Sequence, residues 1–404
     1  MILKYKNLFW LSHLFLSGLI VAIPSLTLVW YLLVLGIGIY KLLFGSNIRL
    51  VVSQLLMYLS GMEMVIRMTR IPLPHEGIKY TSILFLLIAL SRTRSMAKKS
   101  WPLLMLILLL LSIPFSFGAV DLERLRQLIS ANLSGPFLLF IGLYYFLQIT
   151  PFNKREWSSI FLAFLLPATV LVIYVSIVTP SFRTINFSTN ANFEASGYGP
   201  NQMSSALGVA ATFIVYALLY NYRIFLSRWL SFILLGLITF RIILTFSRGG
   251  LFTFLILSAY MFLNYFRQTN VSLSRRFLLG SILLVVFSVG LFQLYDFVDT
   301  VTAGAFEARL FGEENQQGNI QLSDYSSGRS TILVTDVRIF LDHLLGVGPG
   351  MGYYIRKDYG YSVNVSAHIE YSRLLAEHGL FGLVVLISIL VHGWNVYSTN
   401  MKVQ

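Results

Sequence analysis

Apolar segments separated by short polar turns run through most of the chain. An α-helix needs about 20 apolar residues to cross the hydrocarbon core of a bilayer, and about twelve segments approach that length. The first two share residues 8–44 and are divided near Pro24, so we expect both to be short or tilted. The others lie near residues 50–66, 78–91, 101–118, 129–148, 157–179, 200–220, 229–246, 250–266, 277–294 and 379–398. The pattern predicts an all-α, polytopic integral membrane protein. No internal repeat is visible, which favours one integral-membrane domain over residues 1–404.

One long polar segment interrupts this pattern at residues 295–378, directly before the last predicted span. Its second half contains Arg329, alternating glycines from Gly346 to Gly352, and a helix-like stretch with His368. Polar groups are costly in hydrocarbon, so a large polar loop between spans is where a membrane enzyme usually carries out its chemistry. We therefore expect a large helical loop outside the bilayer that carries functional groups.

Basic and acidic residues separate onto the two sides of this topology. Basic residues in the short loops mark the cytoplasmic side of a membrane protein. That side would hold Lys4, Lys6, Lys41, Arg49, Arg92, Arg94, Lys98, Lys99, Lys154, Arg155, Arg223, Arg228, Arg267, Arg275, Arg276 and Lys402. The opposite side collects almost all carboxylates, namely Glu76, Asp121, Glu123, Glu194 and every acid from Asp296 to Glu377. Both termini should therefore be cytoplasmic, with residues 295–378 on the outer face.

The composition supports a membrane protein and excludes several other classes. The chain is 56% hydrophobic and 12% charged, whereas soluble domains carry about 25% charged residues. The net charge of +13 could suggest nucleic acid as a partner, but its placement makes it a topology signal, with membrane lipid as the contact. The chain has no cysteine, which excludes disulfides, thiol catalysis and thiolate metal sites. The first apolar stretch lacks a small-x-small cleavage site, so we expect a retained first span.

Two arginines near the outer face are candidates for binding an anion. Arg248, in the sequence TFSRGG, lies at a predicted junction of two spans. It either snorkels from a helix end or clamps an anion, because its planar guanidinium suits phosphate. Gly249 and Gly250 would let a phosphate approach the next helix N-terminus. Arg241 would lie two turns down the same helix face inside the membrane, either as a functional group or in a buried pair with Glu63.

Two further features on the outer face could serve as helix starts or as ligand contacts. Pro200 suits a first helical position, and Asn201 and Gln202 after it could hydrogen-bond a sugar or phosphate. Arg329 would open an amphipathic helix that Gly346 ends, and it is either a solvated first-turn residue or a functional cation. The apolar face of this helix would pack on the spans or on lipid, and it consists of Leu333, Val337, Phe340, Leu341 and Leu344.

The glycine-rich turn and His368 complete the set of candidates. Gly348 and Gly350 could help to cradle a phosphate, although the turn lacks the Lys-Ser/Thr of a P-loop. A flexible turn before a lid is the alternative. His368 would share a helix face with Tyr371 and could act as a general base near neutral pH, or it is structural. The chain has no Asp-x-Asp pair and no HExxH, so we expect neither a metal nor a cofactor.

Taken in order, these motifs resemble those of a known family. They comprise GPNQ at a span start, SRGG between two spans, GRS in a long outer loop, a GVGPG turn, AHIEY, and LLAEHGLFGL entering the last span. This set resembles the O-antigen ligase and O-antigen polymerase superfamily, bacterial integral-membrane glycosyltransferases of the GT-C type. The motifs cover roughly residues 199–382. The family usually has an asparagine after the histidine, where this chain has Ile369.

The resemblance implies a function in lipopolysaccharide or polysaccharide biosynthesis at the bacterial inner membrane, with the active site facing the periplasm. The donor would be a glycan on undecaprenyl diphosphate, and the acceptor a glycolipid such as lipid A–core, or another glycan. The catalytic residues implied by the motifs are Arg248, Arg329 and His368. They would perform a metal-independent, inverting transfer.

Other functions stay open. A polymerase would use the same donor; we favour a ligase because the loop between the seventh and eighth spans is short, whereas polymerases tend to have two sizeable outer loops. A polysaccharide or lipid transporter would predict paired broken helices and internal symmetry. A non-catalytic assembly protein would not need arginines at helix ends that face one loop.

Overall fold

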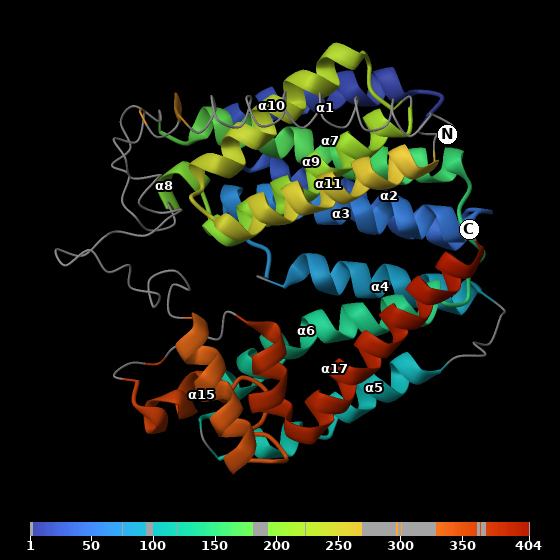
Figure 1. The fold of residues 1–404 in the computed structure, drawn as a ribbon. Helices are drawn as coiled ribbons and strands as arrows, with labels where there is room; N and C mark the ends of the chain where they lie inside the picture. Colours follow the sequence, from blue (N-terminus) through green and yellow to red (C-terminus); the bar gives the residue numbers. More distant parts are fainter. Residues whose placement is uncertain are drawn as a thin grey trace. The chain divides into compact units, whose positions relative to one another are not determined.

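The computed structural model describes residues 3–74, 76–93, 100–118, 120–180, 193–222, 224–268, 296–297, 300, 329–361, 364 and 369–403 (Figure 1). Within these ranges the regular structure is helical and contains no strand. The chain divides into two compact units, residues 1–78 with 151–313 and residues 79–150 with 314–404. The predicted all-α fold is confirmed, while the assignment of one integral domain stays a prediction.

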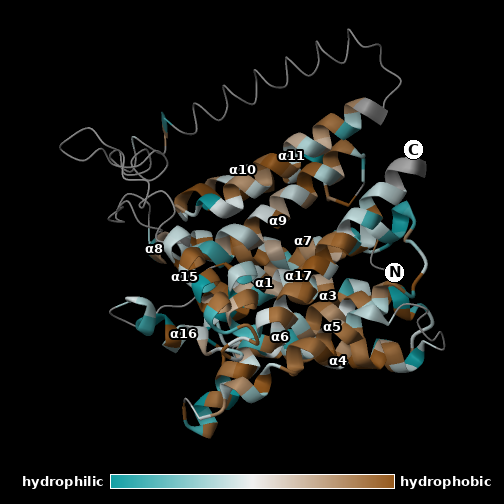
Figure 2. Cartoon of the chain, turned by 60° about the horizontal axis from the view of Figure 1, so that its bottom comes forward, coloured by the Kyte–Doolittle hydropathy of each residue, from teal (hydrophilic) through white to brown (hydrophobic). Residues whose placement is uncertain are grey.

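Seven helices are long and apolar enough to cross a membrane: Leu26–Phe44, Ile48–Thr69, Leu122–Phe146, Lys154–Val178, Pro200–Leu219, Arg248–Phe266 and Glu370–Thr399. Hydrophobic residues are spread over much of the helical ribbon in Figure 2. The span predicted at 277–294 lies outside the described residues, and each of the other predicted spans coincides with a helix. The chain is therefore an all-α, multi-pass membrane protein.

The first unit is built around one helix that is apolar on all sides. Its helices are α1 (Lys6–Ala22), α2 (Leu26–Phe44), α3 (Ile48–Thr69), α7 (Lys154–Val178), α8 (Phe193–Ser196), α9 (Pro200–Leu219), α10 (Arg228–Leu244) and α11 (Arg248–Gln268). α7 contacts α1, α3, α9 and α10, and 83% of its most apolar stretch is buried, as expected for a helix without a polar face. Gly61 permits the close approach of α3, because a Cβ there would lie 2.6 Å from the Phe164 carbonyl oxygen.

Buried polar groups join the first three helices. The break predicted near Pro24 is present, since α1 ends at Ala22 and α2 begins at Leu26. The Tyr58 hydroxyl of α3 accepts a hydrogen bond from Trp30 Nε1 of α2 at 2.8 Å and lies 2.7 Å from His13 Nε2 of α1. Each polar group of this cluster has a partner, as buried polar groups require.

The second unit combines long helices with short helical turns. Its elements are α4 (Gly77–Arg92), α5 (Trp101–Leu110), η1 (Ile113–Ser116), α6 (Leu122–Phe146), α15 (Arg329–Asp342), α16 (Gly352–Ile355), η2 (Arg356–Tyr359) and α17 (Glu370–Val403). α5 ends earlier than its apolar pattern predicts, because Pro114 has no N–H to donate and its ring would clash with the carbonyl of Leu110. α6 begins earlier than predicted, because Asp121 caps it by accepting from the Arg124 amide at 2.9 Å.

α17 contains a sharp break at Gly379, whose φ of 58° and ψ of −135° are not helical. A Cβ at Gly379 would overlap the backbone of Leu344 and Gly346, so only glycine fits at this crossing. The part of α17 before the break packs on α15. Together with α6 and the glycine turn they form a small core of Leu125, Ile339, Val347, Met351 and Ala376.

α15 corrects one expectation, because it ends at Asp342 rather than at Gly346. The apolar face predicted to pack on the spans or on lipid is exposed, with Leu333 at 41% and Leu341 at 63%, so its contact with lipid stays a prediction. The buried face is the opposite one, and it includes the charged Asp336 at 0% exposure, which forms the ion pair described below.

Candidate functional site

The first unit gathers polar groups at the start of α9 and at the turn from α10 to α11. α9 begins at Pro200 as predicted, and Asn201 and Gln202 in its first turn are exposed. Asn201 Oδ1 accepts a hydrogen bond from Ser247 Oγ at 2.8 Å. The turn itself is tight, because Phe246 has a φ of 53°, a left-handed conformation that is rare for a bulky residue. Asn201 therefore lies next to the residue that precedes Arg248.

Arg248 is the first residue of α11, and the two glycines after it differ in their surroundings. Gly250 is buried, and a Cβ there would overlap Ser204 of α9, so its role is close helix packing. Gly249 is exposed, and apart from its chain neighbours and the backbone of its own helix no atom lies within 4 Å of the position that its Cβ would take. The backbone at the N-terminus of α11 is therefore open at Gly249, the geometry that an anion needs to approach it.

Arg241 is not on the same helix as Arg248, so the expected continuous helix face was wrong. Arg241 is buried in α10 with 6% exposure. Its Nη2 donates to the Val175 carbonyl at 2.6 Å, to the Ala195 carbonyl at 3.2 Å, and to Thr179 Oγ1. The predicted partner Glu63 instead accepts from Arg67 at 2.6 Å. Arg241 thus ties α7 and α8 to α10.

The glycine turn of the second unit makes backbone hydrogen bonds to Glu377. Gly346, Gly348 and Gly350 have φ values of 85°, 92° and 80°, a region open to glycine and few other residues. The amides of Gly348 and Gly350 donate to the Glu377 carbonyl at 2.9 Å and to Glu377 Oε2 at 3.0 Å. Since these amides have protein acceptors, the turn does not present them as a phosphate cradle. Gly350 still contributes to a cavity.

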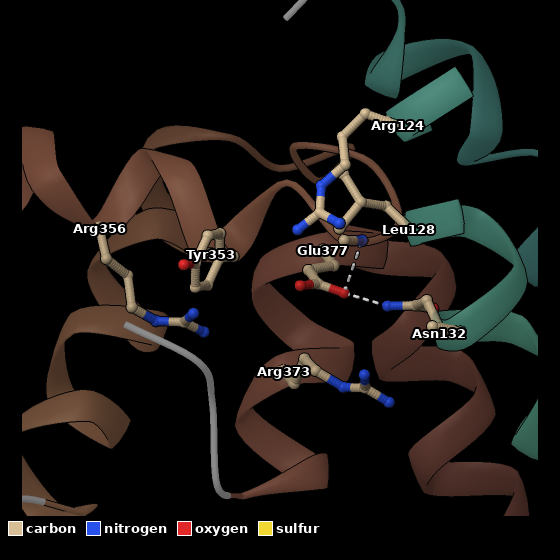
Figure 3. Close-up of a pocket in the computed structure, with 9 residues that line it drawn as sticks. Arg124, Leu128, Asn132, Tyr353, Arg356, Arg373 and Glu377 are labelled. Atoms are coloured by element: carbon tan, nitrogen blue, oxygen red, sulfur yellow. Dashed lines mark hydrogen bonds between the residues drawn. The ribbon is translucent and has the colours of Figure 1, made fainter. Parts of the chain in front are cut away.

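That cavity, of about 410 Å³, lies within the second unit (Figure 3). It is lined by Arg124, Leu128, Ala131 and Asn132 of α6, Gly350 of the turn, Tyr353 of α16, Arg356 of η2, and Arg373 and Glu377 of α17. Figure 3 shows Glu377 at its centre, with arginines from three elements around it. A volume in the range of 300–1,000 Å³ with a few convergent polar groups is typical of a small-molecule site.

One wall of the cavity rests on a buried ion pair. Arg356 and Asp336 are both 0% exposed. Asp336 Oδ1 accepts from Arg356 Nε at 2.9 Å and from Nη2 at 2.6 Å. Ser372 Oγ donates to Asp336 Oδ2 at 2.6 Å. The pair holds η2, α15 and α17 together and fixes the arginine at the cavity wall.

The floor of the cavity is Glu377, which is 3% exposed. Its Oε2 accepts from the Gly350 amide and from Asn132 Nδ2. Asn132 Oδ1 lies 3.2 Å from His378 Nε2, and His378 Nδ1 lies 2.6 Å from Ser112 Oγ. A chain of polar groups from α5 through α17 and α6 therefore orients the carboxyl group of Glu377.

The remaining predicted site residues are only partly described. His368 lies outside the described residues. Arg329 is the first residue of α15, and it belongs to the second unit, whereas Arg248 belongs to the first. Tyr371 is 69% exposed on α17, while its neighbour Ser372 is 2% exposed. The roles predicted for these residues stay predictions.

The cavity also brings together residues that the sequence motifs did not single out, namely Arg124, Asn132, Tyr353, Arg356, Arg373 and Glu377. One signal was available for two of them. Arg373 and Glu377 are four residues apart, directly before an apolar run, which is an unusual place for a carboxylate. The others come from distant parts of the chain, and no local pattern links them.

Comparison with known proteins shows which protein family part of this chain resembles. Residues 236–387 match the family model described as O-antigen ligase. The matched segment includes the α10–α11 turn with Arg248, the start of α15, the glycine turn and the first part of α17. Neither the curated proteins nor the solved structures give a match. Over residues 236–387 the chain is similar to O-antigen ligases, and this similarity supports a membrane glycosyltransferase of the O-antigen ligase and polymerase type in general terms.

Proposed function

We propose that the protein transfers a glycan from undecaprenyl diphosphate to an acceptor hydroxyl at the periplasmic face of a bacterial inner membrane. The acceptor would be lipid A–core or a similar glycolipid, with another glycan as the polymerase alternative. The observation that carries the proposal is the family match, which spans Arg248, Arg329 and His368. The open backbone at Gly249, next to Arg248 at the start of α11, supports an anion site there.

The chemistry needs charge neutralisation and a proton acceptor. The donor carries its own leaving group, because the diphosphate departs from C1 of the first sugar with the bonding electron pair. Arg248 and Arg329 would stabilise the developing negative charge by preorganised electrostatics. His368 would accept the proton of the attacking hydroxyl or orient that hydroxyl. Attack on the face opposite the diphosphate inverts the configuration at C1.

The direct test is transfer by the purified full-length chain in lipid nanodiscs. The probes are a glycan on undecaprenyl diphosphate and a set of acceptors that includes lipid A–core and free glycans. Transfer to lipid A–core supports a ligase, and chain extension of the glycan supports a polymerase. Activity should persist in excess EDTA, because the sequence has neither an Asp-x-Asp pair nor an HExxH motif. Absence of transfer to every acceptor would contradict the proposed function.

Replacement of the two arginines by lysine should impair transfer severely. Arginine binds phosphate with a planar fork of donors, and lysine cannot reproduce that geometry. Arg248→Lys and Arg329→Lys should each lose on the order of 3 kcal/mol of transition-state stabilisation, measured as the fall in kcat/KM. Arg228→Lys is the matched control, because Arg228 is an exposed first residue of α10. Near-normal transfer by both site variants would argue against a forked clamp.

The proposed periplasmic site requires the segment before α17 to face outward. The chain lacks cysteine, so single cysteines can report on topology. Asp358→Cys, at an exposed position in η2, should react with a membrane-impermeant maleimide in intact cells. Lys41→Cys, at an exposed position in the last turn of α2, should react only after lysis. The reverse pattern would contradict the orientation assigned by the positive-inside rule.

A further inference from the structure

We propose that the cavity of the second unit is a carbohydrate subsite in which Glu377 accepts hydrogen bonds from sugar hydroxyls. The inference rests on the proposed function, because it takes a glycan as the substrate. It adds a binding site formed by α6, the glycine turn, α16, η2 and α17. None of its residues is among Arg248, Arg329 and His368.

The main observation is a carboxylate oxygen that opens into the cavity from a buried side chain. Glu377 is 3% exposed, and its Oε2 accepts from the Gly350 amide and Asn132. Its Oε1 accepts no hydrogen bond among the described residues and faces the space between Arg124, Tyr353 and Arg373 (Figure 3). A hydroxyl group in the cavity would donate a hydrogen bond to this oxygen.

The surrounding polar chain fixes this acceptor in place. If His378 carries its proton on Nε2, it donates to Asn132 Oδ1. This sets the orientation of the Asn132 amide, so that Nδ2 faces Glu377. Ser112 Oγ lies 2.6 Å from His378 Nδ1 and 2.7 Å from the Leu109 carbonyl oxygen, and its one proton serves one of these two acceptors. Locked rotamers of this kind are what a preorganised binding site needs.

The charge around the cavity favours hydroxyl groups over a diphosphate. Three arginines contribute to the wall, but Arg356 is paired with Asp336, and Arg373 is paired with Glu370. Asp336 and Glu370 therefore offset two of the three arginines. A neutral polyhydroxyl ligand can hydrogen-bond to both the acceptors and the donors of the cavity, and it needs no net charge to do so.

The rim supplies the other contacts that a sugar ring uses. Arg124 is exposed, and its Nε and Nη1 bond Tyr354 and Gln127, which leaves Nη2 as a donor toward a ring or hydroxyl oxygen. The half-buried ring of Tyr353 and the side chain of Leu128 offer apolar surface for the C–H face of a sugar. This mixture of one fixed acceptor, arginine donors and apolar surface fits one sugar residue of a donor or acceptor glycan.

Glu377→Gln is a sharp test, because the amide orientation is dictated by the protein. The oxygen must stay at the Oε2 position, where it accepts from Gly350 and Asn132. The NH₂ group then takes the place of Oε1 and changes the cavity acceptor into a donor. Loss of a charge-assisted hydrogen bond should weaken sugar binding by about tenfold or more. Glu123→Gln is the matched control, because Glu123 is exposed in the same unit and does not line the cavity.

Binding is measured on the full chain in nanodiscs by saturation-transfer difference NMR. The sugar probes are methyl β-glucoside and N-acetylglucosamine, and the anion probe is inorganic diphosphate. The wild type and Glu123→Gln should bind at least one sugar probe, and Glu377→Gln should lose that binding. Arg124→Gln, at an exposed position, should weaken it several-fold, and this second variant still tests the subsite if Glu377→Gln does not fold. Unchanged sugar binding in both variants would overturn the inference, as would diphosphate binding that Glu377→Gln strengthens.

Transfer kinetics distinguish a donor glycan from an acceptor glycan as the ligand of the subsite. They also test the subsite separately from the proposed function. A higher KM for the acceptor in Arg124→Gln assigns the subsite to the acceptor glycan, and a higher KM for the lipid-linked donor assigns it to the donor glycan. If the wild type transfers glycan but neither KM changes in either variant, the subsite is wrong and the proposed function stands. If sugar binding depends on Glu377 but no lipid diphosphate donor is used, the proposed function fails and the subsite stands.

Discussion

Asp336→Asn is expected to lower the free energy of unfolding of the second unit by about 3–5 kcal/mol. Asp336 and Arg356 are both fully buried, and the carboxylate accepts two hydrogen bonds from the guanidinium and one from Ser372. The asparagine keeps the shape but removes the charge, so the buried Arg356 loses the carboxylate of its ion pair. Arginine cannot relieve this by losing its proton. The measurement is unfolding by SDS in mixed micelles, supported by the midpoint of thermal unfolding.

The same helix supplies a matched control. Asp342→Asn is the identical change at an exposed position of α15, where the carboxylate accepts only from the Tyr359 hydroxyl at 2.6 Å. Its cost should stay below about 1 kcal/mol. The double variant Asp336→Leu with Arg356→Met should cost less than Asp336→Asn alone, because it removes both charges and keeps apolar volume. Equal effects of Asp336→Asn and Asp342→Asn would show that the pair does not stabilise this unit.

Most of the helices could be predicted from the sequence because membrane spans are long, apolar and locally encoded. The break between α1 and α2 at Pro24 and the start of α9 at Pro200 follow from the covalent limits of proline. The early end of α5 follows from Pro114 in the same way, but a hydropathy pattern continues through it. The early start of α6 depends on a single cap at Asp121. A helix boundary that depends on one hydrogen bond does not show in hydropathy averaged over many residues.

The candidate sites were predicted less completely, and the reasons differ from residue to residue. Arg248 and Asn201 could be found because each lies at a helix end with a short local motif. Arg241 was assigned the wrong partner, because the two carbonyls and the hydroxyl that bind it lie 46 to 66 residues away in sequence. Glu377 is bound by Asn132 across 245 residues. Such long-range pairs depend on tertiary packing, so the spacing of residues along the sequence does not predict them.

The buried face of α15 shows the same limit in another form. Helical periodicity places Leu333, Leu341 and their neighbours on one apolar face, which we expected to pack on the spans or on lipid. In the fold, the opposite face is buried because Asp336 can satisfy its charge with Arg356 and Ser372. The exposed apolar face is then consistent with contact to lipid, as the sequence reading allowed. The hydrophobic pattern of one helix does not reveal an ion pair whose second residue lies on another element.

His368→Ala is expected to lower turnover by roughly 10²–10⁴-fold, the usual contribution of a general acid or base. His368 lies outside the described residues, so the expectation rests on the sequence motif and on the proposed function. Donor binding should stay nearly unchanged, because Arg248 and Arg329 are the proposed diphosphate ligands. Single-turnover kinetics with the lipid-linked donor separate the two effects, since they measure binding and chemistry independently. His343→Ala is the control, as His343 is exposed just after α15.

His368→Gln then distinguishes proton transfer from orientation of the acceptor. Glutamine can hydrogen-bond a hydroxyl group, but it cannot take up its proton at a useful pH. If His368 is the general base, the Gln variant should be as slow as the Ala variant. If the Gln variant keeps most of the activity, His368 positions the acceptor hydroxyl and another group takes the proton. An Ala variant that loses donor binding as much as turnover would instead place His368 in the diphosphate site, and the role proposed for it would be wrong.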